Sequence, residues 1–265
     1  MQNSSIEWTH HTFNPWEGCT KVSNGCLNCY ADRINTRLRG GLNWGLNAPR
    51  RHPSQSYWDA PILWNRRAEK LGERHRVFSG SMCDVFEGRD DLNQARERLF
   101  TLIDETPHLD WLLLTKRPEN IVTMTKAHWP DGLPYNVWMG TSAENQTTYN
   151  ERVEALSFVK CAVKFVSLEP LLGPIVLNDL DARPGDQLGW YLDWVIMGGE
   201  SGGARDRAMR AEWARDIVRQ VINMDRPLFF KQWGSHSEEL QRVGKHAAGH
   251  ELDGVTYHQF PASQV

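Results

Sequence analysis

The chain has 265 residues, of which 40% are apolar and 24% are charged, a composition typical of a globular protein with ample material for a core. Its formal net charge of -3 argues against a protein that coats duplex DNA through a general basic field. We find no charged-then-apolar leader and no apolar run of about 18 residues. The sequence therefore predicts a cytoplasmic protein without a membrane partner.

Short, uninterrupted apolar runs recur along the chain, as in strands that are buried on both faces of a parallel sheet. Strands are expected at 77–78, 111–114, 137–139, 164–166, 194–197 and 228–230, with a further one at 6–9. Between some of these runs, apolar residues spaced by three and four predict helices over 92–103 and 213–222. This alternation predicts an α/β fold with parallel strands, as a full or partial (β/α)6-type barrel. We expect one domain over 1–265, with a cysteine loop at 16–30 and a C-terminal extension from about 234 to 265.

Polar and charged side chains follow most of the expected strands. In barrels and open α/β sheets the active site gathers at the carboxyl ends of the strands, so these side chains are expected on one rim. The rim residues are Ser79, Ser81, Cys83, Asp84, Lys116, Ser142, Glu144, Asn145, Glu169, Glu200 and Lys231. Ordinary turns and helix caps are polar as well, but Lys and Glu directly after apolar strands in most units favour an active site.

Three of the five cysteines, Cys19, Cys26 and Cys29, are spaced C-x6-C-x2-C. An odd number of cysteines in a chain without a leader argues against a disulfide framework and for a metal site. Thiolates select zinc, copper(I) or iron–sulfur. Zinc would normally take a fourth protein ligand, which His10 or His11 could supply, whereas a [4Fe–4S] cluster with one open iron needs three cysteines only. The spacing leaves both metals open.

Several single residues also have two interpretations. Cys83 is either small apolar packing or a rim thiol that donates a hydrogen atom. Glu169 either points into the site or merely precedes Pro170 in a solvent-exposed loop. Around Glu200, the glycine-rich segment 198–203 could instead cradle a phosphate through its backbone N–H groups.

A series of motifs extends over almost the whole chain in a fixed order. They are Trp8-Thr9, Asn14-Pro15-Trp16-Glu17-Gly18-Cys19, Leu-Thr-Lys-Arg-Pro at 114–118, Ser-Ala-Glu-Asn-Gln at 142–146, Ser-Leu-Glu-Pro-Leu-Leu-Gly at 167–173, Gly-Gly-Glu-Ser-Gly at 198–202 and Phe-Lys-Gln-Trp-Gly at 230–234. In this order they resemble the phage-associated three-cysteine-motif proteins. That family of unknown function is related to radical S-adenosylmethionine (SAM) enzymes, among which spore photoproduct lyase is one of the nearer characterised relatives.

The resemblance implies a radical SAM barrel and a radical SAM-type enzyme. In similar enzymes three cysteines bind a [4Fe–4S] cluster, SAM chelates the fourth iron, and reductive cleavage of SAM yields a 5′-deoxyadenosyl radical. It further implies a nucleic acid or nucleotide-derived substrate in a phage context, a flavodoxin- or ferredoxin-like electron donor, and a dedicated partner protein encoded nearby. The first cysteine gap is three residues longer than in the commonest radical SAM spacing, C-x3-C-x2-C. The alternative is a zinc-stabilised, non-enzymatic barrel that binds nucleic acid or protein.

The same resemblance suggests roles for individual residues. Cys19, Cys26 and Cys29 would hold the cluster. The cofactor-binding set would be Ser79, Ser81 and Asp84 for the SAM amino group, Lys116 for its carboxylate or a substrate phosphate, Ser142, Glu144 and Asn145 for ribose hydroxyls, and Tyr30 beside adenine. The candidates for substrate chemistry are Glu169, Glu200, Lys231 and Cys83.

Overall fold

The computed structural model describes residues 4–177, 192–203 and 205–262. The chain forms two compact units. Unit 1 comprises Met1–Gly140 and Phe158–Ala162, and unit 2 comprises Thr141–Ser157 and Val163–Val265. The expectation of one domain over 1–265 stays a prediction.

Among the described residues, seven strands follow one another in the sheet in the order of the sequence, β1 to β7. They are β1 (His11–Phe13), β2 (His75–Ser79), β3 (Leu109–Thr115), β4 (Val137–Ser142), β5 (Val163–Leu168), β6 (Trp194–Gly198) and β7 (Leu228–Gln232). The pairs β1–β2, β2–β3, β5–β6 and β6–β7 are all parallel. The predicted α/β fold with parallel strands is confirmed, and the six apolar runs from 77 to 230 all fall within strands.

The helices lie between these strands or follow them. They are α1 (Tyr30–Arg39), α2 (Gln55–Leu71), α3 (Asn93–Asp104), α4 (Ile121–Thr125), α5 (Gln146–Ser157), α6 (Ala211–Asn223) and α7 (Lys245–Ala248). Short 3-10 helices cover Asn24–Cys26, Asp90–Leu92 and Pro118–Asn120. The two helices expected at 92–103 and 213–222 are confirmed as α3 and α6. Within the described ranges, none of the helices has the length and apolar character that crossing a membrane requires.

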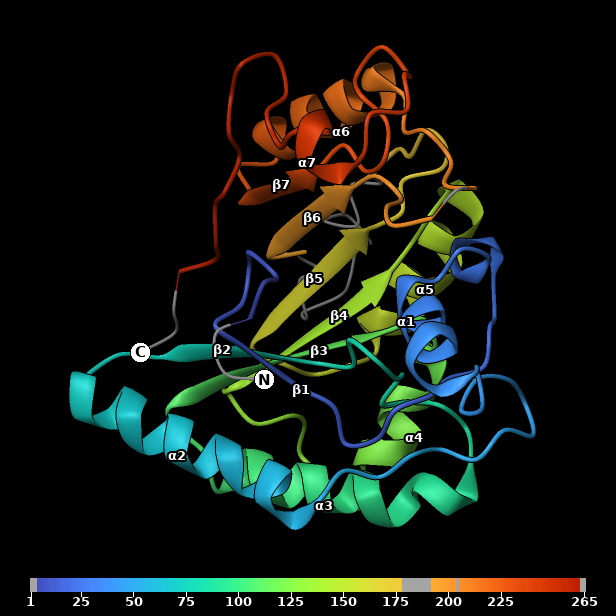
Figure 1. The fold of residues 1–265 in the computed structure, drawn as a ribbon. Coiled ribbons are helices and arrows are strands. Elements are labelled where there is room, and N and C mark those ends of the chain that lie inside the picture. The colour runs from blue at the N-terminus through green and yellow to red at the C-terminus, as the bar shows by residue number, and fades with distance from the viewer. Residues whose placement is uncertain (1–3, 178–191, 204, 263–265) are drawn as a thin grey trace. The chain divides into compact units, whose positions relative to one another are not determined.

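Unit 1 is built on β1, β2 and β3, with α2 and α3 on the same side of these strands (Figure 1). The register places His11 beside Val77, and Val77 beside Trp111. Helix α3 turns Leu99, Leu102 and Ile103 into the core, because residues spaced by three and four share one face of a helix.

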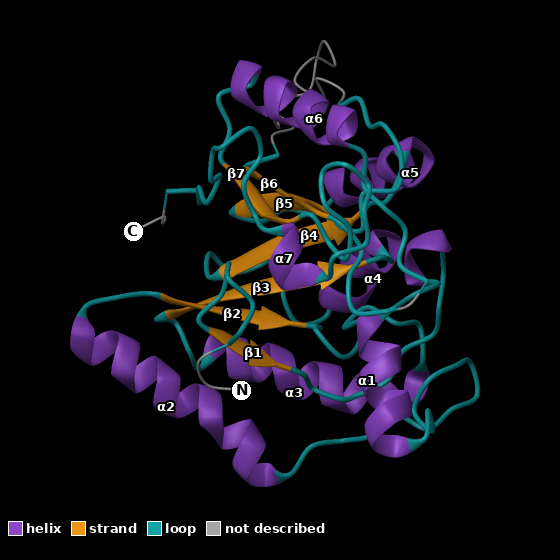
Figure 2. Cartoon of the chain, turned by 45° about the horizontal axis from the view of Figure 1, so that its top comes forward, coloured by secondary structure: helices purple, strands orange, loops and turns teal. Residues whose placement is uncertain are grey.

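Unit 2 has its own apolar core around β5, β6 and β7. Ala214, Ile217 and Val221 of α6 pack there against strand residues, and α6 covers β6 and β7 (Figure 2). From α5, Tyr149 and Val153 enter the same core. Part of the expected C-terminal extension packs on this unit too, since the ring of His258 stacks on Phe229 with centroids 4.4 Å apart.

The strand expected at 6–9 is wrong, because the first strand begins at His11. Residues 6–9 form a turn that is closed by a hydrogen bond from Thr9 N to Ile6 O (3.1 Å). The Thr9 hydroxyl then donates to Arg76 O, and Trp8 packs on Phe78 with ring centroids 4.6 Å apart. The apolar character of this segment therefore reflects a buried tryptophan and not a pleated strand.

Candidate metal-binding site

The cysteine loop follows β1 in unit 1 and ends at the start of α1. A 3-10 turn over Asn24–Cys26 carries the second cysteine, with Cys26 N donating to Ser23 O at 3.0 Å. Cys29 is the residue that caps the N-terminus of α1. All three loop thiols are free and partly exposed. The Ser23-Asn24-Gly25 sequence favours such a turn, since small polar residues and glycine adopt it readily.

The loop begins at a glycine that no other residue can replace without a shift of the backbone. Gly18 has φ of 118°, and an added Cβ would lie 2.2 Å from Asn43 O and 2.8 Å from Arg50 Cδ. Its N–H donates to Met82 O at 2.9 Å, which joins the loop to the segment after β2. The backbone just before Cys19 is therefore tightly enclosed.

Two cations at the end of β3 act on the three thiols. Nη1 of Arg117 donates to the Cys19 sulfur at 3.8 Å. Burial alone would raise the pKa of the Cys26 thiol, but Lys116 and hydrogen bonds at Ser23 bring it below its ordinary value. Lys116 also opposes the effect of burial on Cys29. The residues that follow β3 thus supply positive charge to the whole cysteine loop.

Burial dominates at the two outer cysteines. It raises the pKa of Cys19 to about 12, with Asp84 adding to the rise and Arg117 opposing it. It also raises the pKa of Cys29, against hydrogen bonds from the backbone N–H groups of Asp32 and Ala31. Because a metal ion binds the thiolate and displaces the proton, these two thiols would ionise on binding it.

A buried ionic network lies behind the loop. Asp84 accepts from the Thr115 hydroxyl at 2.6 Å, from Lys116 N at 3.1 Å and from Arg117 Nη1 at 2.7 Å. Both carboxylate oxygens of Asp84 are thereby engaged within the protein. This position was predicted as a SAM contact, and its observed contacts shape the loop after β3.

A second arginine completes the network from the other side. Arg50 is fully buried and forms an ion pair with Glu87 at 2.7 Å. Its guanidinium also donates to the backbone carbonyls of Asn43, Gly45 and Ala48, and to the Thr20 hydroxyl at 2.9 Å. The predicted site residues did not include Arg50, Glu87 or Arg117. Arg117 could have been identified from the sequence, because it lies in the motif at 114–118.

Four other predicted residues lie in unit 1, and three of them contact other residues of the protein through hydrogen bonds or packing. The Ser79 hydroxyl is completely buried and has no hydrogen-bond partner among the described residues. The Ser81 hydroxyl is 2.9 Å from Asn14 Nδ2, and Tyr30 OH donates to Ser81 O at 2.7 Å. Cys83 is buried in an apolar cluster with Trp16, Leu92 and Ala95, as expected of a packing residue.

In unit 2 the structure places Glu169 beside Lys231. Nζ of Lys231 donates to both carboxylate oxygens of Glu169, at 2.7 and 2.9 Å, and Gln232 Nε2 approaches one of them at 3.5 Å. This pair is partly exposed, with the two side chains 23% and 16% accessible. Two residues predicted separately at the ends of β5 and β7 therefore form one ion pair.

The remaining predicted residues of unit 2 are held by internal contacts. Glu144 is completely buried and pairs with Arg152 at 2.9 Å, while Arg152 also donates to Ser142 O at 2.7 Å. The Asn145 side chain accepts from Thr148 N at 3.0 Å in the first turn of α5. Their predicted ribose contacts stay predictions.

Glu200 also has a protein partner. It accepts from both the backbone N–H (2.8 Å) and the guanidinium of Arg207. Gly199, directly before it, allows close packing, because a Cβ at this position would lie 1.9 Å from Trp233 O. Gly203 N donates to Asp206 Oδ2 at 2.6 Å, so this amide is directed at a carboxylate of the protein itself.

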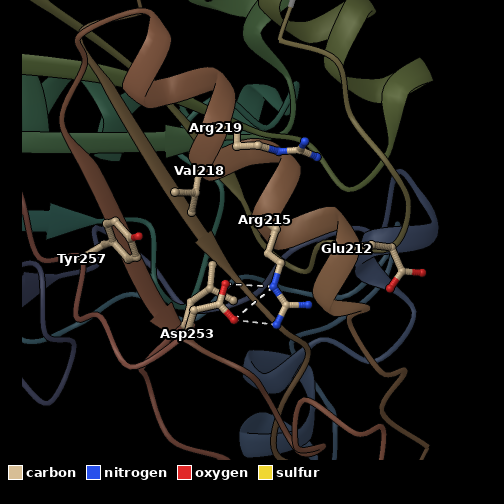
Figure 3. A pocket seen from close by; sticks show the side chains of 7 residues that line it. Glu212, Arg215, Val218, Arg219, Asp253 and Tyr257 are labelled. Atoms are coloured by element: carbon tan, nitrogen blue, oxygen red, sulfur yellow. Dashed lines mark hydrogen bonds and ion pairs between the residues drawn. The ribbon is translucent and has the colours of Figure 1, made fainter.

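Unit 2 contains a cavity of about 460 Å³ at α6 that none of the predictions involved. Glu212, Arg215, Val218 and Arg219 line it from the helix, and Asp253 and Tyr257 from the C-terminal segment (Figure 3). Arg215 Nε donates to Asp253 Oδ2 at 2.9 Å. This exposed ion pair ties the helix to the C-terminal segment and balances the charge of Arg215, while the second cation at the cavity, Arg219, pairs with Asp216.

The two histidines proposed as a fourth zinc ligand have partners of their own. His11 Nε2 lies 3.2 Å from His75 Nδ1, and His10 Nδ1 accepts from Arg76 N at 2.8 Å. Both therefore pack on the beginning of β2, whereas the cysteine loop follows the end of β1. Across 4–177, 192–203 and 205–262, no three His, Cys, Asp or Glu side chains are assembled around a metal position.

The chemistry of the donor set nevertheless fits an iron–sulfur cluster better than zinc. The loop supplies three thiols and no imidazole, whereas a structural zinc site normally has four protein ligands. Arg117 and Lys116 supply the positive charge that thiolates need. The residues that would hold a cluster are Cys19, Cys26 and Cys29, and the buried Ser79 hydroxyl at the end of β2 has no hydrogen-bond partner among the described residues.

Comparison with known proteins gives one family and one group of structures. The model of a family described as "Protein of unknown function (DUF5131)" matches residues 3–261. No curated protein matches the chain. A variant of spore photoproduct lyase with bound AdoMet and dinucleoside spore photoproduct matches with a TM-score of 0.46 and 12% identity, over 80% of this chain and 61% of that one. The same enzyme complexed with dinucleoside spore photoproduct matches with a TM-score of 0.44 and 13% identity, over 77% and 58%. The chain spans about three fifths of the length of these structures.

Proposed function

We propose that this chain, which belongs to the DUF5131 family over 259 of its residues (3–261), is a radical SAM-type iron–sulfur enzyme. The observation that carries the proposal is that one short loop after β1 presents three thiols, Cys19, Cys26 and Cys29. A cluster bound by three protein ligands has one iron open to a small molecule. The motifs of the sequence suggest SAM as that molecule.

When bound, the cluster and SAM would supply the radical chemistry, and the protein would supply ligation, orientation and exclusion of water. Cys19, Cys26 and Cys29 hold the metal in this proposal. Lys116 and Arg117 balance the charge of the thiolates. The buried Ser79 hydroxyl is the first candidate for a SAM contact, because it has no hydrogen-bond partner among the described residues.

Glu169 and Lys231 are the charged side chains that we propose for contact with the substrate. Each could bind a polar group, since the carboxylate accepts hydrogen bonds and the ammonium donates them. The substrate class that we propose, a nucleic acid or a nucleotide-derived compound, rests on the motifs of the sequence, as do the phage context, the electron donor and the partner protein.

The proposal is tested by reconstitution without oxygen. The purified protein is incubated with iron and sulfide, and its absorbance and its iron and sulfide content are measured. SAM and dithionite are then added, and 5′-deoxyadenosine is quantified. We expect broad iron–sulfur absorption and formation of 5′-deoxyadenosine.

Single-cysteine variants provide the matched control. Cys26→Ala should abolish cluster absorption and SAM cleavage, whereas Cys161→Ala, which removes a cysteine outside the loop, should retain both. Binding of zinc in place of iron, with no 5′-deoxyadenosine, would refute the enzyme. That result would favour the zinc-stabilised binding protein instead.

A further inference from the structure

Arg117 contacts the start of the cysteine loop with both of its terminal nitrogens. Nη1 donates to Cys19 Sγ at 3.8 Å and to Asp84 Oδ2 at 2.7 Å, and Nη2 donates to Thr20 O at 2.6 Å. The Arg117 side chain is only 9% exposed. Its charge is therefore close to one sulfur and is shielded from water.

The position of this guanidinium is fixed before any ligand binds. Asp84 holds Arg117, and Asp84 is itself held by the Thr115 hydroxyl and by Lys116 N. Arg50 and Arg117 contact different atoms of the loop. Arg50 binds the Thr20 hydroxyl, whereas Arg117 binds the Thr20 carbonyl and the Cys19 sulfur. Arg50 thus holds a side chain of the loop, whereas Arg117 acts on the sulfur itself.

We propose that Arg117 is a positioning residue that orients Cys19 as a ligand and raises the reduction potential of the metal centre bound by the three cysteines. This inference rests on the proposed function. Three thiolates give the centre a negative charge, and the electron that reduces it adds one more. Hydrogen bonds to the ligand sulfurs and nearby positive charge favour the reduced state, and both set the potential of such centres.

The redox step in question is a one-electron reduction of the [4Fe–4S] centre from its 2+ to its 1+ state. Dithionite supplies the electron in the test, and no bond is formed or broken. Arg117 keeps its proton, because a guanidinium does not lose it in proteins. Its contribution is therefore a fixed N–H donor to the sulfur and a fixed positive charge that offsets the nearby Asp84 carboxylate.

The test compares Arg117→Met and Arg117→Lys with Arg96→Met. Arg96 is a matched control, because it is buried in the same unit and donates to Val85 O and Glu87 O at 2.8 and 2.7 Å. Each protein is reconstituted without oxygen, its iron and sulfide are quantified, and its midpoint potential is measured by redox titration. We expect a more negative potential in Arg117→Met, an intermediate one in Arg117→Lys, and the wild-type potential in Arg96→Met.

Each outcome has a defined meaning. An unchanged potential in loaded Arg117→Met overturns the inference, and so does an equal shift in Arg96→Met, since that would report a general disturbance of unit 1. If Arg117→Met binds no iron, Arg117→Lys decides, because an ammonium keeps the charge but not the fork geometry. A potential below that of the wild type then supports the inference, and an equal potential overturns it. Failure of the wild-type protein to form a centre refutes the proposed function instead.

Discussion

The buried pair of Arg50 and Glu87 tests how the cysteine loop is anchored. The Arg50 side chain is fully buried and that of Glu87 is 3% exposed, so Arg50→Met leaves a carboxylate stranded in the interior. Removing one partner of a buried ion pair costs about 3–5 kcal/mol. Arg117 lies 3.9 Å from Glu87 and compensates in part, whereas three backbone carbonyls each lose the hydrogen bond that Arg50 donates. These effects oppose each other, so we expect a loss of about 4 kcal/mol in the free energy of unfolding.

The assay is urea denaturation of the metal-free, reduced protein, monitored by tryptophan fluorescence. A double variant, Arg50→Met/Glu87→Gln, serves as the control, because it removes the stranded charge together with its partner. Since residues in contact couple by about 0.5–3 kcal/mol, the double variant should regain stability relative to Arg50→Met. A loss below about 1 kcal/mol in Arg50→Met, or a double variant less stable than the single one, would refute this account of the anchor.

Three further predictions concern single residues. Burial, followed by the neighbouring His75 and His10, lowers the pKa of His11 from 6.5 to about 4, so the folded state keeps this imidazole neutral while the unfolded chain protonates it. The contribution of neutral His11 to stability is therefore complete above pH 6.5 and is lost as the pH falls towards 4. In urea titrations, His11→Phe should lose less stability between pH 7 and pH 5 than the wild type does. An equal loss in the two proteins would contradict this assignment. Arg152→Leu removes the ion-pair partner of the completely buried Glu144 and should cost about 3–5 kcal/mol by the same assay; an unchanged denaturation midpoint would contradict this. Cys83→Ala should cost about 1 kcal/mol and leave iron loading intact, whereas lost loading would make Cys83 a ligand.

The strands could be predicted because buried parallel strands carry a strong local signal. Runs such as Trp111–Leu114 are apolar on both faces, and no neighbour is needed to recognise them. Helix α2 was not predicted. Its buried residues, among them Trp58, Pro61, Trp64 and Ala68, do recur every three or four positions, but Pro61 in the middle normally marks the end of a helix and so obscured this pattern. Packing against β2 and β3 stabilises this helix where the local sequence argues against it.

In the candidate site, too, the features with a local sequence signal could be predicted and those that depend on distant residues could not. Cysteine spacing is local, so the three thiols could be recognised from the sequence alone. The pairing of Arg50 with Glu87 joins residues 37 positions apart on irregular segments, for which no periodicity exists. Asp84 illustrates the resulting error of emphasis. A carboxylate after a strand suggests a ligand contact, but the sequence does not reveal that Thr115 and Arg117 already occupy its oxygens.

The enclosed backbone at Gly18 has a consequence for the thermodynamics of metal capture. Binding one centre through three cysteines closes rings in the chain, and each ring costs conformational entropy that grows with the number of free residues. With Gly18 confined by Asn43 and Arg50, and Thr20 held by two arginines, that cost falls on the few residues between Lys21 and Gly25. Folding of the unit therefore already orders part of the segment between Cys19 and Cys26, so less conformational entropy is lost when a metal centre binds, although this gap is three residues longer than the commonest one.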